Sequence, residues 1–478
     1  MTRPLLAALI VTAALAAQAC HRPVDNSIYA PALQRIVTGT PGWVDHTALG
    51  ARLWTIERHF YQQRQFMPAW VNGDAPAPAM AGLVRALERS DEHGLDPLRY
   101  GLKDFAAARA QATDKAGTLR FAIDAVPPMD ARMTYAYLQY AADLLGWTHN
   151  PRDVYENWRT EPQRDDLAAR LDDAVSTGRV GETLDALAPT HPQYKGLQAA
   201  LATERAHPDG HLDQLKMNLE RWRWMPRDLG DRYVLVNVPA YQMQVIDQGH
   251  PVVAMRVIVG RADTPTPLFS DEMTYIVFSP YWNIPESIIK KETIPHMVRD
   301  PDYLERNHIE VVGTNGKTVD NPSAIDWSND AAVEKLRFRQ APGPENALGL
   351  VKFIFPNHFN VYLHDTPNDG LFSKRDRDLS HGCIRLENPV ALAQYVLRNR
   401  PEWTAERIAD AMHAKSQQVV TLKHHLPVHI GYWTAWVEPD GRTVTYTADP
   451  YGIDAAHERL LRGETPQPVK ASPTPAAA

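Results

Sequence analysis

Cys383 and His364 are the two residues of this sequence whose side chains could together carry out nucleophilic catalysis. A cysteine attacks as its thiolate, so it needs a lowered pKa, which a neighbouring imidazolium commonly supplies. His364 precedes Cys383 by 19 positions (383 − 364), whereas His381 is two residues away and can point elsewhere. From the residues alone, a buried and inert cysteine with an unrelated histidine nearby is the alternative.

The segment that contains His364 alternates in polarity like a strand. Val361 and Leu363 are separated by polar side chains, which predicts a strand that presents His364 on one face at its end. A histidine on a separate strand can be delivered to Cys383 across a cleft. We therefore expect His364 to be the base.

Cys383 itself lies in a predicted turn, Ser380-His-Gly-Cys-Ile-Arg. Gly382 lets the backbone approach another group closely. Asn388 and Pro389 suit the N-cap and first turn of a helix. We therefore expect Cys383 to lie just before a helix, where backbone N–H groups can stabilise a thiolate and later an oxyanion.

The second of only two cysteines, Cys20, follows a predicted export signal. Residues 1–19 combine an arginine, an apolar run and the Ala17-Gln-Ala pattern of a cleavage site. This placement resembles a bacterial lipoprotein signal, in which the cysteine becomes lipid-modified; simple cleavage before Cys20 is the alternative. Cys383 then has no disulfide partner in its chain, which favours a free reactive thiol.

Length and charge narrow the class of protein. A chain of 478 residues exceeds what one hydrophobic core usually serves, so we expect two domains. A formal net charge of −7 argues against a general nucleic-acid binder, which would normally be basic. Beyond the N-terminal segment no stretch approaches the ~20 apolar residues that a membrane helix requires, so we expect an exported, soluble protein.

Residues 30–228 predict a mainly helical scaffold domain. The segment from Ala79 to Arg89 has an apolar helical face, and Asp130 can cap a second helix that ends near Gly146. A further apolar face begins at Leu212. The predicted domain boundary lies at 229–230.

Residues 230–425 predict a β-rich domain, so the expected fold class is α+β. The strand pattern lapses over about 285–345, where residues 286–299 look helical and the rest loop-like, which predicts an inserted lid subdomain. Residues 426–464 predict a hairpin around Pro439-Asp-Gly and a helix. Residues 465–478 are rich in Pro and Ala and predict a disordered tail.

The motif Ser380-His-Gly-Cys-Ile-Arg, preceded by His364, resembles the signature of the YkuD-type L,D-transpeptidases. Other segments are similar to the large, YcbB-like branch of that family, which carries a helical scaffold domain. They are Phe66-Met-Pro-Ala-Trp, Asn218-Leu-Glu-Arg-Trp-Arg-Trp-Met-Pro, Ser279-Pro-Tyr-Trp-Asn-Ile-Pro and Tyr432-Trp-Thr-Ala-Trp-Val. The chain departs from that branch by leaving no room before Leu212 for a small peptidoglycan-binding module.

The resemblance implies a role for each residue of the motif and its surroundings. Cys383 would be the nucleophile and His364 the base. Ser380, His381 and Gly382 would shape the turn, and the N–H groups of Gly382 and Cys383 would form the oxyanion hole. On the substrate side it implies Arg385 facing a carboxylate or tying down the turn, Tyr362 and Trp282 lining the cleft, and Asp365 orienting His364 through its carbonyl or side chain. Plain packing is the alternative for Trp282 and Tyr362.

The implied reaction is acyl transfer on peptidoglycan stem peptides of the diaminopimelate type, in the periplasm of a Gram-negative bacterium. A tetrapeptide stem would acylate Cys383 and release D-Ala, and a second stem would resolve the thioester into a 3→3 cross-link. No metal and no organic cofactor is implied. A lipidated Cys20 would anchor the protein to a membrane, and the oligomeric state is left open.

Some rival functions would use the same cysteine site, and one would use no catalytic site at all. Water, a D-amino acid or a lipoprotein lysine could resolve the thioester in place of a second stem, and the sequence does not separate these acceptors. A thiol protease is a weaker rival. A non-catalytic wall-binding scaffold protein is the rival of another class, and the intact pair Cys383 and His364 argues against it.

Overall fold

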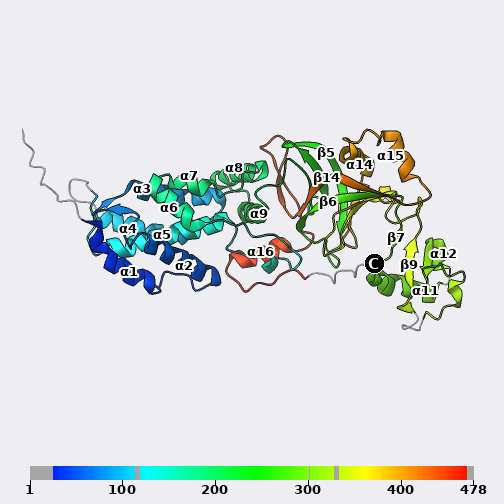
Figure 1. Cartoon of the computed structure of the whole chain (residues 1–478), viewed down its shortest axis with the longest axis horizontal. Coiled ribbons are helices and arrows are strands. Elements are labelled where there is room, and N and C mark those ends of the chain that lie inside the picture. The colour runs from blue at the N-terminus through cyan, green and yellow to red at the C-terminus, as the bar shows by residue number, and fades with distance from the viewer. Residues whose placement is uncertain (1–24, 113–118, 301, 328–332, 471–478) are drawn as a thin grey trace, which may run out of the picture. The chain divides into compact units, whose positions relative to one another are not determined.

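The computed structural model describes residues 25–112, 119–300, 302–327 and 333–470 (Figure 1). The predicted signal and Cys20 lie outside these residues. The chain divides into two compact units, one helical and one β-rich, which confirms the predicted α+β class. The first comprises the described residues up to Asp91 with Asp96–Ala142 and Asp165–Leu187; the second comprises Glu92–Leu95, Asp143–Arg164 and the described residues from Ala188 onward.

The helical unit contains α1 Ala30–Thr38, α2 Ala48–Gln63, α3 Pro78–Glu88, α4 Leu102–Ala112, most of α5 Val126–Leu144, α6 Leu167–Thr177 and α7 Val180–Asp185. Asp130 does not cap α5, because the helix begins at Val126. Its fully buried carboxylate instead accepts hydrogen bonds from the N–H groups of Ala69 and Trp70 and from the hydroxyl of Tyr61. The predicted cap is wrong because tertiary partners, not the helix end, satisfy this side chain.

The second unit is built on a sheet in the order β12-β5-β13-β11-β10-β6-β14-β3-β4. Because β4 also pairs with β5, eight of these strands close into a ring and β12 extends it. The strands are β3 Arg232–Asn237, β4 Gln242–Asp247, β5 His250–Gly260, β6 Phe269–Phe278, β10 Val351–Ile354, β11 Leu363–His364, β12 Asp378–Ser380, β13 Ile384–Leu386 and β14 Gln418–Gly431.

One large hydrophobic core lies within this unit. Alternate residues of the strands, such as Val234 and Val236 of β3, are fully buried in it. Three helices of this unit, labelled in Figure 1, are α14 Pro389–Leu397, α15 Ala405–Met412 and α16 Ile453–Leu461. They contribute Leu392, Ile408 and Ile453 to the same core. The sheet that carries the predicted site is therefore rigidly packed on its apolar side.

The inserted subdomain (residues 285–345) is more regular than expected. It contains α10 Glu286–Ile288, a π-helical turn Ile289–Thr293, α11 Ile294–Arg299 and α12 Tyr303–Arg306. The predicted loop-like remainder is wrong, because β8 Ile309–Val312 and β9 Arg337–Gln340 form a three-stranded sheet with β7 Trp282–Asn283. A separate small core that includes Val311 and Phe338 holds these elements together.

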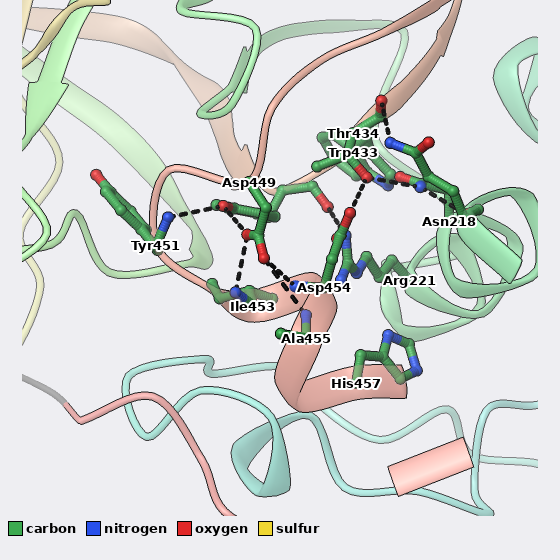
Figure 2. A network of polar contacts seen from close by, with 12 residues as sticks. Asn218, Arg221, Trp433, Thr434, Asp449, Tyr451, Ile453, Asp454, Ala455 and His457 are labelled. Atoms are coloured by element: carbon green, nitrogen blue, oxygen red, sulfur yellow. Dashed lines mark hydrogen bonds and ion pairs between the residues drawn. The ribbon is translucent and has the colours of Figure 1, made fainter. Parts of the chain in front are cut away.

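The predicted boundary at 229–230 is not where the compact units part. Helices α8 Pro192–Ala206 and α9 Leu212–Trp224 belong to the β-rich unit. Figure 2 shows the cause: fully buried Arg221 of α9 forms an ion pair of 2.6 Å with Asp454 of α16, and Thr434 donates to the same carboxylate. A buried charge needs such a partner, so α9 is tied to the C-terminal segment.

The C-terminal segment contains the predicted hairpin, formed by β15 Ala435–Val437 and β16 Val444–Tyr446. The predicted disordered tail is wrong up to residue 470, because the N–H of Val469 donates to the carbonyl of Val154 at 2.9 Å. Residues 471–478 lie outside the described residues. No helix in the described part of the chain is both long enough and apolar enough to span a membrane.

Candidate active site

Three adjacent strands bring the candidate site together. On β11, His364 lies opposite Lys352 of β10 on one side and opposite Arg385 of β13 on the other. Residues paired across a sheet point to the same face, so these three basic side chains form a row. The neighbouring residues on the other face, Phe353, Leu363 and Ile384, are fully buried in the core.

Cys383 lies beside this row, next to Tyr362. The N–H of Ile384 donates to the carbonyl of Tyr362 at 3.2 Å. The parallel pairing of β11 with β13 therefore aligns Cys383 with Tyr362, two residues before His364 and on the same face. The thiol is free and partly exposed, and Sγ lies 3.9 Å from the carbonyl oxygen of Asn360. Cys383 and His364 therefore share one face of neighbouring strands.

The turn before Cys383 is closed by Ser380. Its hydroxyl donates to the carbonyl of Cys383 at 2.5 Å and accepts from the N–H of Gly382 at 3.1 Å. Gly382 has a φ of +115°, which only glycine adopts without strain. The N–H of Gly382 is thus engaged within the turn, and of the two expected oxyanion donors only Cys383 has an N–H without a hydrogen bond among the described residues.

A second set of residues, which the sequence analysis missed, holds this turn from behind. Thr266 donates to the carbonyl of Gly382 at 2.9 Å and Thr264 to that of Ser380 at 3.1 Å. The hydroxyl of Tyr451 donates to the carbonyl of Gly260 at 2.7 Å. The only sequence signal was a Thr-Pro-Thr-Pro segment between two strands, and nothing local connects Tyr451 to it.

His364 is oriented by the backbone that follows it. The ring is only 4% exposed, and Nδ1 lies 2.5 Å from the carbonyl oxygen of Asp365. A protonated Nδ1 donates this bond, so Nε2 is the ring nitrogen that can accept a proton. The Asp365 carboxylate is used elsewhere, because it accepts the N–H of Leu350 at 2.7 Å. Of the two expected orienting groups of Asp365, the carbonyl is the one in place.

Burial and the flanking cations decide the charge of the pair. Burial, together with the positive charges of Arg385 and Lys352, lowers the pKa of His364 to about 3. Burial raises the pKa of the Cys383 thiol, while hydrogen bonds from Tyr362 and the same two cations oppose this rise. The free protein therefore holds a neutral thiol and a neutral imidazole near pH 7.

The expected thiolate–imidazolium pair is thus wrong for the free protein. Both groups are described in full, and no hydrogen bond joins Sγ of Cys383 to the imidazole of His364. The expected position at a helix start is wrong as well. Strand β13 separates Cys383 from α14, which begins at Pro389 with the side chain of Asn388 accepting the N–H of Ala391 at 3.0 Å.

The remaining predicted residues divide between the row and the inserted subdomain. The Tyr362 ring lies 5.6 Å from the His364 ring, and Nε of Arg385 is buried without a hydrogen bond. His381 turns away from Cys383, and its Nε2 lies 2.6 Å from Oε1 of Glu292 in the π-helical turn. Trp282 belongs to β7 and packs against the small core of the inserted subdomain.

A metal site is not among the features of the described residues, since no three histidine, cysteine or carboxylate side chains converge there. The chemistry available to the site is that of one thiol, one imidazole, one phenol and two flanking cations. Such a set can form and resolve an acyl-thioester.

Family models match two parts of the chain. A scaffold domain covers residues 57–201, and an L,D-transpeptidase catalytic domain, YkuD, covers residues 231–420. A Haemophilus influenzae protein named "Putative L,D-transpeptidase" is 31% identical over 368 residues, which cover 74% of each of the two chains. The chain belongs to the L,D-transpeptidase family. The predicted resemblance to its scaffold-bearing branch is confirmed.

Solved structures of the family are more distant. The Ldtfm–avibactam carbamoyl enzyme is 15% identical, and the match covers 43% of this chain and 50% of that one with a TM-score of 0.20. An L,D-transpeptidase from Mycobacterium smegmatis is 14% identical, with coverages of 42% and 58% and a TM-score of 0.20. The chain thus spans less than two thirds of either structure's length, and scores this low add nothing to the family assignment.

Proposed function

We propose that this protein is an exported cysteine L,D-transpeptidase that joins peptidoglycan stem peptides of the diaminopimelate type through 3→3 cross-links. One observation carries the proposal beyond family membership. His364, with Nδ1 held by the Asp365 carbonyl, shares a face of neighbouring strands with the free thiol of Cys383. This is the arrangement that a nucleophile and its base require.

Acylation is the first half of the reaction. The proton of the Cys383 thiol passes to Nε2 of His364 as the sulfur attacks the carbonyl carbon of the third residue of a tetrapeptide stem. A C–S bond forms, and the oxyanion is stabilised by the N–H of Cys383. The C–N bond to D-Ala then breaks, and His364 returns its proton to the departing amine.

Resolution of the thioester is the second half. The side-chain amine of a diaminopimelate in a neighbouring stem attacks the thioester carbonyl, so that a C–N bond forms and the C–S bond breaks. His364 takes the proton from the amine and returns it to the sulfur. Arg385 faces a stem carboxylate, and Tyr362 and Trp282 border the bound peptide.

Mass spectrometry of purified tetrapeptide-containing muropeptides tests this function. We expect the wild type to release D-Ala and to form cross-linked dimers. Cys383→Ala should lower D-Ala release at least about a thousandfold, because the covalent route is lost, with unchanged circular dichroism and thermal midpoint. His364→Gln should lower it by about 10²- to 10⁴-fold, the usual contribution of a positioned base. Full activity in Cys383→Ala would end the cysteine mechanism.

The same products identify the acceptor. A cross-linked dimer supports the proposal, whereas tripeptide indicates hydrolysis, an exchanged fourth residue indicates D-amino-acid transfer, and a lysine adduct indicates lipoprotein attachment. Any of the last three as the main product would contradict 3→3 cross-linking but would still agree with an acyl-enzyme intermediate.

The location is proposed from residues 1–20, which lie outside the described residues. We infer export to the periplasm, with a lipidated Cys20 anchoring the mature protein to a membrane. The mass of the mature N-terminal peptide checks both steps. A diacylglyceryl adduct on Cys20 supports anchoring, and an unmodified peptide that begins at Cys20 supports simple cleavage instead.

A further inference from the structure

Lys352 is the residue of the site to which the sequence assigned no role. It lies in the row with His364 and Arg385, and its Nζ is 5.6 Å from the centre of the Tyr362 ring. No ion pair joins Lys352 or Arg385 to a carboxylate among the described residues, whereas Arg221 and Arg339 of the same unit each have one.

Two cations are thus held on a partly buried surface without an internal anion. Burial lowers the pKa of Lys352 and of Arg385, and each is pulled back by the negative charge of an ionised Cys383. An unpaired buried charge is costly and is retained only where something offsets the cost. The thiol of Cys383 is the group of this face whose ionised form attracts both cations.

The elements around the row and the turn at Cys383 carry further charged or titratable groups. They are Lys352 on β10, Tyr362 and His364 on β11, Arg385 on β13, Arg261 and Asp263 in the loop after β5, and the bonded pair His381 and Glu292. Asp263 is engaged by Arg261 at 3.1 Å, and Glu292 by His381 at 2.6 Å. The carboxylates of this set are therefore occupied, while the two cations of the row are not.

We propose that Lys352 is a positioning residue of the reaction, which together with Arg385 supplies the fixed positive charge that stabilises the negative sulfur of Cys383 as the thiol proton passes to His364. The inference rests on the proposed function, since it explains how the thiol can ionise although no hydrogen bond joins it to the imidazole in the free protein. It also assigns the two tasks to different groups: the cations stabilise the negative sulfur, and His364 only carries the proton. Two cations and one thiolate leave the face with a net positive charge, which favours an anionic acyl donor.

Alkylation of Cys383 by two small reagents tests this charge directly. Iodoacetamide is neutral and iodoacetate is anionic, and both form the same C–S bond with loss of iodide. Rate constants are measured from pH 6 to pH 10 for the wild type, Lys352→Met, Lys352→Arg and the control Lys423→Met, which removes an exposed lysine of β14. Circular dichroism confirms that each variant is folded.

For Lys352→Met we expect about a tenfold slower reaction with iodoacetamide at pH 7, the effect of raising the thiol pKa by about one unit, and a rising limb displaced to higher pH. The preference for iodoacetate over iodoacetamide should fall with it. Lys352→Arg should keep both the rate and the preference, because it keeps the charge, and Lys423→Met should match the wild type.

Two results would overturn the inference. One is a Lys352→Met variant with the wild-type profile and reagent preference. The other is an equal loss at every pH with no recovery in Lys352→Arg, which would indicate a packing role alone. The alkylation results do not depend on cross-linking activity. A shifted alkylation profile in a protein that forms no cross-links would support the proposed role of Lys352 and contradict the proposed function. Cross-linking by the wild type with an unshifted profile in Lys352→Met would support the function and contradict the role of Lys352.

Discussion

Two regions of the β-rich unit bury positive charge in opposite ways. In the network of Figure 2, Arg221 is fully buried but forms an ion pair of 2.6 Å with Asp454, whose carboxylate also accepts from Thr434. In the row of basic side chains at the candidate site, Lys352 and Arg385 flank His364 and have no carboxylate partner among the described residues. The first arrangement has its negative partner within the chain, and the second gains one only when Cys383 or a ligand carries negative charge.

The difference separates what each region is for. A buried cation with its partner in place holds α9 to the C-terminal segment, so its loss should cost stability. A partly buried cation without a partner costs stability in the resting protein and contributes to the chemistry instead. Removing the cation from the first region should therefore lower the free energy of unfolding, and removing one from the second should raise it. The following experiments test this contrast.

The largest effect is expected for Arg221→Met. It leaves the half-buried carboxylate of Asp454 opposite an apolar side chain. We therefore expect a loss of about 3 kcal/mol in the free energy of unfolding of the β-rich unit, measured by denaturant titration. Arg462→Met, which removes an exposed partner of Glu458, should cost under about 1 kcal/mol. An unchanged midpoint for Arg221→Met would show that the network contributes nothing to stability.

A smaller, pH-dependent effect is expected for His364. Its folded pKa of about 3 lies below the ordinary value of 6.5, so the unfolded chain binds the proton more readily between these values. Stability should fall as the pH drops from about 6.5 towards 3, with a slope of at most about 1.4 kcal/mol per pH unit from this group. His364→Gln should lack that part of the slope. Identical slopes for the wild type and variant would show that the imidazole is not held neutral.

The smallest effect is expected for Lys352→Met, and its sign is the point of interest. Removing an unpaired, partly buried ammonium should raise the free energy of unfolding by about 1 kcal/mol while activity falls. Thermal melting of both variants under one set of conditions compares it with Arg221→Met. A destabilised Lys352→Met would mean that this lysine has a structural partner, and the contrast between the two regions would disappear.

Much of the architecture could be predicted because it depends on local pattern. The alternation of Val361 and Leu363 and the glycine at 382 led to the strand and the turn, and both are present. The helix predicted from Ala79 is α3, and the one from Leu212 is α9. The inserted subdomain was located, but β8 and β9 were missed because each is only four residues long.

The errors share a different cause, which is contact between residues far apart in the chain. Asp130 reads as a helix cap until Ala69 and Trp70 are seen to donate to it. The compact units part before α8 and not at 229–230, and Arg221 of α9 finds its partner at Asp454. Thr266 and Tyr451, which support the turn at Gly382, carry no pattern of their own.

Residue types and spacing alone were enough to predict the α+β division of the chain and to point to two candidate residues, a cysteine in a glycine turn and a histidine on a strand before it. Only the folded sheet decided the electrostatics. Strand pairing places Lys352 and Arg385 on either side of His364, and burial makes both the thiol and the imidazole neutral. Local patterns report what a side chain can do, whereas its charge depends on neighbours and burial that arise only when distant strands pair.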